Sequence, residues 1–102
     1  MKFAEQLAAL PSSDHLQRIE LHLPDGTLAG VIENKPGSQG SVKVYQYLFQ
    51  KFACINAQAA REGLKIYAEH TEDAEQHPGK HPNIDILFDV ISTGVVLKVS
   101  LI

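Results

Sequence analysis

The sequence has only one cysteine, Cys54. A single cysteine excludes an intramolecular disulfide and a zinc site built from several cysteines, and it agrees with a reducing compartment. Cys54 lies between Ala53 and Ile55, with no basic or histidine neighbour in sequence to activate its thiol. We therefore interpret Cys54 as a small packing residue and expect the protein in the cytoplasm.

Long apolar runs and an excess of basic residues are also missing. No stretch approaches the roughly 20 apolar residues that span a bilayer, and Met1–Leu7 lacks the apolar core of a signal peptide. Nine Lys and Arg against twelve Asp and Glu give a net charge of −3. Because such a chain has no global positive field to hold DNA or RNA, neither a nucleic acid nor a membrane is an expected partner.

What is present is the composition of a globular protein. At 102 residues the chain has room for one hydrophobic core, which buries roughly two thirds of the unfolded surface at this size. We therefore expect residues 1–102 to form a single domain.

The first third of the chain predicts a short helix and a hairpin. Residues 2–10 carry apolar side chains at helical spacing, and Pro11 ends that pattern. Residues 16–23 and 27–32 read as strands, the first with clear alternation of apolar and polar side chains. Between them, Pro24-Asp25-Gly26 is typical of a tight turn.

The middle of the chain predicts a long helix and a third strand. From Ser41, a plausible N-cap, apolar residues recur at helical spacing as far as Gly63, a plausible C-terminal stop. Residues 64–69 then alternate again and predict a strand that follows the helix almost without a loop.

The last third predicts a loop, a helix and a strand. Residues 70–83 are polar and rich in histidine. Residues 84–93 fit both a helix and a strand, but Asn83 as N-cap, Asp85 in the first turn and Gly94 as terminator favour the helix. Residues 95–102 alternate and predict a terminal strand.

The resulting order, α-β-β-α-β-α-β, predicts an α+β fold of two layers, in which helices cover one face of a four-stranded mixed sheet. Strand-helix-strand units in one sheet are usually parallel and right-handed. Two such crossovers would bring the loops 34–41 and 70–83 to the same sheet edge, where ligands of open α/β sheets bind.

The first of these loops has the composition of an anion site. Gly37 and Gly40 expose backbone N–H groups, the helix end at Ser41 offers unpaired donors, and Lys35 adds a positive charge. The loop lacks the Gly-Lys-Ser/Thr ending of a Walker loop and the three-glycine spacing of a dinucleotide fingerprint. A plain turn followed by a helix cap is the alternative interpretation.

The second loop contains His70, His77 and His81, with four acidic residues in or next to it, Glu69, Glu72, Asp73 and Glu75. Imidazole and carboxylate groups bind divalent metals, but Pro78 and Gly79 interrupt the helix that would put two of the histidines on one face. A solvated acidic loop is the alternative, and we predict no metal site and no cofactor.

His81 is the best-placed general acid or base in this loop. However, no nucleophile is paired with it in sequence, and no Gly-x-Ser-x-Gly motif is present. We therefore assign no catalytic residue.

Three stretches, Ile32–Tyr45, Tyr67–Ala74 and Pro78–Asp85, resemble a family of small bacterial proteins, domain of unknown function 2322. The resemblance covers the whole chain. It implies a bacterial origin and supplies neither a function nor functional residues.

The leading hypothesis is a small cytosolic binding domain for an anionic ligand or a partner protein. Its candidate binding residues are Lys35, Ser38, Gln39, Ser41, His70, Lys80, His81 and Asn83. Two alternatives are open, a small enzyme that uses His81 as acid or base, and a structural protein that forms a homodimer through the terminal strand.

Overall fold

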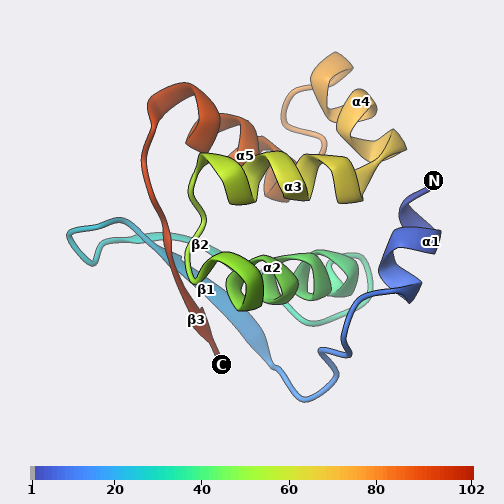
Figure 1. Cartoon of the computed structure of the whole chain (residues 1–102), viewed down its shortest axis with the longest axis horizontal. Coiled ribbons are helices and arrows are strands. Elements are labelled where there is room, and N and C mark those ends of the chain that lie inside the picture. Colours follow the sequence, from blue (N-terminus) through green and yellow to red (C-terminus); the bar gives the residue numbers. More distant parts are fainter. Residues whose placement is uncertain (1) are drawn as a thin grey trace.

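The computed structural model describes residues 2–102, which form five helices and one three-stranded sheet (Figure 1). In chain order the elements are α1 (Phe3–Ala8), β1 (Arg18–His22), β2 (Leu28–Glu33), α2 (Gln39–Phe52), α3 (Ala57–Tyr67), α4 (Glu69–Gln76), α5 (Pro82–Thr93) and β3 (Lys98–Leu101). None of the helices in this part of the chain is long and apolar enough to cross a membrane.

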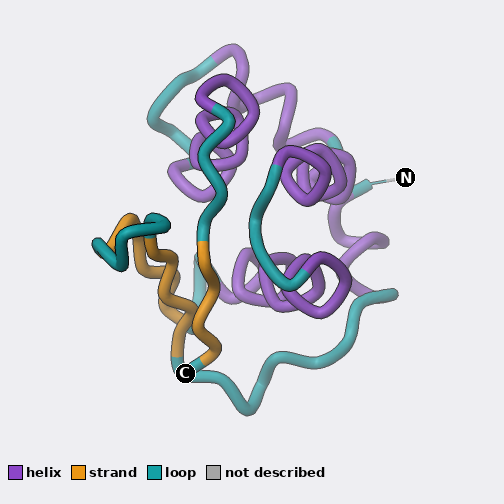
Figure 2. Tube along the Cα trace, turned by 60° about the vertical axis from the view of Figure 1, so that its left-hand side comes forward, coloured by secondary structure: helices purple, strands orange, loops and turns teal. Residues whose placement is uncertain are grey.

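The sheet is antiparallel throughout, with the order β2-β1-β3. In the register, Ile19 of β1 lies opposite Ile32 of β2 and Leu101 of β3. The helices lie to one side of this sheet (Figure 2). The predicted α+β class fits, but the four-stranded mixed sheet is wrong, because β3 returns from α5 antiparallel to β1 and no parallel crossover exists in residues 2–102.

The predicted long helix is in fact two helices. Ala53 adopts a left-handed φ of 64° and donates its N–H to the Phe49 carbonyl at 2.8 Å, which closes α2. Asn56 then caps α3, because its side chain accepts a hydrogen bond from the Ala59 N–H at 2.8 Å. Between the two helices, Ile55 forms two backbone hydrogen bonds with Leu97, at 2.9 and 3.0 Å, and so ties the link to the chain that enters β3.

The predicted third strand is also wrong, since residues 64–67 are the last turn of α3. The buried residues of α3 recur at helical spacing, namely Ala59, Ala60, Gly63, Ile66 and Tyr67. Gly63 therefore lies inside a helix and does not end one. This helix packs on both α2 and α5, which is why its apolar residues continue past Gly63.

The segment predicted as the polar loop 70–83 begins with the helix α4, of which only Ala74 is buried. Pro78 and Gly79 follow this helix and, as predicted, no helix contains both His77 and His81, since residues 77–81 are not helical.

The remaining elements agree with the sequence patterns. The hairpin, α1, α5 and β3 are all present, although α5 starts at Pro82, with His81 and not Asn83 at the N-cap position. Proline suits this first helical position because its missing N–H would have no partner there. Similarly, α2 starts at Gln39 with Ser38 at the N-cap position.

The core lies between the sheet and the helices. Ile19 and Leu21 of β1 are fully buried, as are Tyr45 and Leu48 of α2 and Leu87 of α5. The helix α2 packs on β1 and β2, so its N-terminus lies near the segment that connects β2 to α2.

Candidate functional site

A cavity of about 620 Å³ lies where α1, the N-termini of α2 and α5, and the junction of α3 and α4 come together. Its lining includes Phe3 and Leu7 of α1, the 13–14 segment, and Lys43 of α2. The full set is Phe3, Leu7, Ser13, Asp14, Asn34, Gly37, Gln39, Gly40, Ser41, Lys43, Tyr67, His70, Lys80, His81, Pro82, Asn83 and Ile84. The two polar segments singled out in the sequence therefore meet here.

Most of the candidate binding residues line this cavity, namely Gln39, Ser41, His70, Lys80, His81 and Asn83. Lys35 and Ser38 do not. Lys35 is exposed outside the cavity, and the Ser38 hydroxyl donates a hydrogen bond to the Glu33 carbonyl at 2.5 Å. The parallel crossovers expected to unite the two loops are absent from residues 2–102, so helix packing and not sheet topology brings them together.

Two buried tyrosines, Tyr45 and Tyr67, connect the helices around the cavity by hydrogen bonds. The Tyr67 hydroxyl of α3 donates to the Ser41 Oγ of α2 at 2.7 Å, and the Tyr45 hydroxyl of α2 donates to the Asn83 carbonyl of α5 at 2.5 Å. Burial raises the pKa of both phenols above the usual range, so both hydroxyls keep their protons at neutral pH. These two bonds connect α3 to the start of α2, and α2 to the start of α5.

An aromatic wall closes the side of the cavity next to α1. The Phe3 ring stacks on Tyr67 with their centroids 5.1 Å apart, and it forms a T-shaped pair with the His70 ring, also at 5.1 Å. The His70 and His81 rings lie 5.6 Å apart. The Phe3 N–H donates to the Glu69 Oε1 at 2.8 Å, a bond that also lowers the pKa of the Glu69 carboxyl. The short helix α1 is thus attached to the α3–α4 junction by stacking and by one charge-assisted hydrogen bond.

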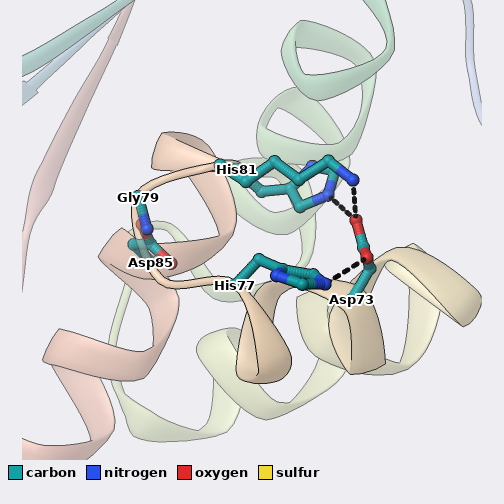
Figure 3. Close-up of polar contacts among 6 residues, drawn as sticks. Asp73, His77, Gly79, His81 and Asp85 are labelled. Carbon is teal, nitrogen blue, oxygen red and sulfur yellow. Dashed lines mark hydrogen bonds and ion pairs between the residues drawn. The ribbon is translucent and has the colours of Figure 1, made fainter.

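Beside the cavity, the Asp73 carboxylate of α4 contacts three basic side chains (Figure 3). Its Oδ2 lies 2.6 Å from the His81 Nε2 and 2.9 Å from the Lys80 Nζ, and its Oδ1 lies 3.8 Å from the His77 Nε2. The hydrogen bonds from His81 and then from Lys80 lower the pKa of Asp73 from 3.8 to about 2. In the same loop, the Gly79 N–H donates to the Asp85 carboxylate at 2.9 Å, so the chain between α4 and α5 is held at both ends.

Although His77 and His81 approach the same carboxylate, no group of three or more His, Cys, Asp or Glu side chains in residues 2–102 is arranged to hold a metal ion.

Sequence reasoning missed Phe3, Lys43, Tyr67 and Asp73. The sequence pattern places Phe3 in the apolar stripe of the first helix and Tyr67 among the residues that alternate with apolar ones in a strand, and neither position indicates a cavity wall. Asp73 had one local signal, its spacing of four residues from His77, which at the end of α4 places the two side chains near each other.

The model of the family described as "Uncharacterized protein conserved in bacteria (DUF2322)" matches residues 3–101, so the chain belongs to this family, as the resemblance of its motifs predicted. Neither a curated protein nor a solved structure matches the chain.

Proposed function

We propose that this member of a bacterial family of unknown function binds a small organic anion, a carboxylate or a phosphate ester, in the cavity between α1, α2 and α5. A cytoplasmic binding protein of this kind agrees with the single cysteine. The observation that carries the proposal is the gathering of Lys43, His70, Lys80 and His81 around one cavity of about 620 Å³. Small-molecule sites in proteins commonly have volumes of roughly 300–1,000 Å³.

The charges around the cavity support an anionic ligand. The chain as a whole has a net charge of −3, so a group of basic side chains on one surface is not a consequence of general composition. Among the described residues that line the cavity, Asp14 is the only acidic one, against two lysines and two histidines. The cavity therefore differs in sign from the protein that surrounds it.

Backbone donors add to this preference. Within residues 2–102, the N–H groups of Gly40 and Ser41 at the start of α2 and of Asn83 at the start of α5 have no hydrogen-bond acceptor. All three residues line the cavity. Free N–H groups and the positive ends of two helices favour a negative group nearby, which supports the same ligand class as the side chains do.

The test is a binding screen with a matched pair of lysine variants. Thermal shift and isothermal titration would use inorganic phosphate and simple mono-, di- and tricarboxylates, since a ligand of the native state raises the melting temperature. Lys43→Met removes a cavity charge and keeps the length of the side chain. Lys35→Met makes the same change a few residues away at an exposed position outside the cavity.

We expect a saturable shift for the native chain and for Lys35→Met, with Lys43→Met binding weaker by roughly tenfold, the usual effect of losing one charge-assisted hydrogen bond. The proposal fails if no anion binds, or if the two variants bind equally.

One observation favours a second candidate function, general acid–base chemistry by His81. The Asp73 carboxylate holds the His81 Nε2 at 2.6 Å, an arrangement that orients an imidazole ring, and His81 lines the cavity. For any anion that binds, an NMR time course with the native chain and with His81→Gln separates the two functions. Product formed by the native chain alone supports an enzyme, and no product from either supports binding only.

A homodimer through the terminal strand, which is an edge strand of the sheet, stays a prediction.

A further inference from the structure

Lys80 and His81 lie between an internal carboxylate and the cavity. Both residues line the cavity, and both contact the Asp73 carboxylate, at 2.9 and 2.6 Å. Asp73 itself does not line the cavity and approaches from α4 (Figure 3). The same basic pair therefore serves an internal carboxylate and the proposed anion site.

Asp73, the internal partner, lies close to both basic groups, but few contacts hold it in this position. The side chains of Asp73 and Lys80 are 32% and 59% exposed, so water surrounds their ion pair. Exposed ion pairs contribute little to stability because solvent screens them. Ala74 is the one buried residue of α4, so few core contacts hold this helix in its present position. Exchanging the Asp73 carboxylate for another anion would disturb little else.

We propose that Asp73 is an internal competitor for the anion site, so that a bound carboxylate or phosphate group takes Lys80 and His81 over from it. This inference rests on the proposed function. In the free protein, the Asp73 carboxylate is the partner of both basic groups. When an anion of the same chemistry enters the cavity, Lys80 and His81 turn to it and α4 loses its attachment to the start of α5.

Two carboxyl-to-amide variants of the same helix test this competition. Asp73→Asn removes the competing charge and keeps the shape of the side chain. Glu72→Gln makes the same change of charge at the neighbouring, exposed position of α4, for which no ion pair with a basic side chain occurs within residues 2–102. The dissociation constant for inorganic phosphate would be measured for both variants and for the native chain by isothermal titration at one ionic strength.

We expect Asp73→Asn to bind phosphate at least fivefold more tightly than the native chain, and Glu72→Gln to change the constant by less than twofold. Equal or weaker binding by Asp73→Asn overturns the competition, and so does an equal gain in Glu72→Gln, because the effect would then be one of general charge. If the native chain and both variants all fail to bind phosphate and carboxylates, the proposed function itself fails.

A measurement on the native chain keeps the inference testable if Asp73→Asn folds poorly. Amide hydrogen exchange would be followed with and without saturating phosphate. We expect exchange to become faster in Glu69–Gln76 and slower at the start of α2. Slower or unchanged exchange in Glu69–Gln76 contradicts the release of α4.

Discussion

Gly63 allows α3 to pack closely on two other helices, and Gly63→Ala should therefore destabilise the protein. A Cβ atom at this position would lie 2.8 Å from the Leu87 Cδ1 of α5 and 3.0 Å from the Leu48 Cδ1 of α2. Both leucines are fully buried, so neither side chain can move aside into solvent. Excess volume in a packed core costs about 1–3 kcal/mol.

Helix propensity acts in the opposite direction. Replacing glycine by alanine inside a helix is favourable by about 1 kcal/mol when nothing obstructs the new methyl group. The contacts at 2.8 and 3.0 Å decide the sign, because they are shorter than real Cβ contacts normally are. We expect a net loss of up to about 2 kcal/mol, which for a chain near 100 residues lowers the melting temperature by up to roughly 10 °C.

The assay is urea denaturation followed by circular dichroism, with the same substitution made in a second background. Leu87→Val removes the Cδ1 atom that the new methyl group would meet most closely. In that background Gly63→Ala should cost less than in the native background or become neutral, since only the 3.0 Å contact with the Leu48 Cδ1 still opposes the gain in helix propensity. An equal loss of stability in both backgrounds would refute the role of Leu87, and a stabilised Gly63→Ala in the native background would refute the close approach altogether.

Two further predictions concern the acid limb of stability and the end of α2. Asp73 has its pKa lowered from 3.8 to about 2 in the folded protein, so its contribution to stability is present above about pH 4 and is lost as the pH falls toward 2. Urea midpoints measured between pH 2 and pH 5 should therefore fall less steeply in Asp73→Asn than in Glu72→Gln, and identical slopes would contradict the shift. Ala53 has a φ of 64°, so Ala53→Gly should raise the free energy of unfolding by about 0.5–1 kcal/mol without changing the urea m-value. A lower urea midpoint would mean that the alanine is not strained.

Local signals in the sequence were sufficient where one short segment decides the structure. The turn Pro24-Asp25-Gly26 predicts the hairpin, because each residue favours a tight turn for its own reason, and β1 and β2 flank it. Likewise Gly94, with a φ of 75°, ends α5 where the sequence places a terminator. Neither prediction depends on what packs against the element.

The errors arose where periodicity was carried across a break. Ile55 and Ala59 continue the apolar face of α2 in sequence, although a left-handed Ala53 and the cap at Asn56 separate two helices there. Asn56 indicates the start of the second helix, since asparagine before Ala-Gln-Ala-Ala is typical of an N-cap. The alternation of Leu64 and Ile66 fits a strand over a few residues, but α3 buries Ile66 against other helices. Short apolar patterns cannot separate these two structures.

Most of the binding residues predicted from the sequence line the cavity, although the predicted sheet topology was wrong. Lys, His, Asn and Ser side chains in the two polar segments are not needed for the core, and this property is visible without knowing the strand order. Helix packing brings these segments together, and two hydrogen bonds of buried tyrosines connect them, from Tyr45 of α2 to the Asn83 carbonyl of α5 and from Tyr67 of α3 to Ser41 of α2. A tyrosine in an apolar pattern predicts burial but not the partner of its hydroxyl, because that partner comes from another helix. Only the folded chain therefore reveals these two hydrogen bonds and the helix starts that they connect.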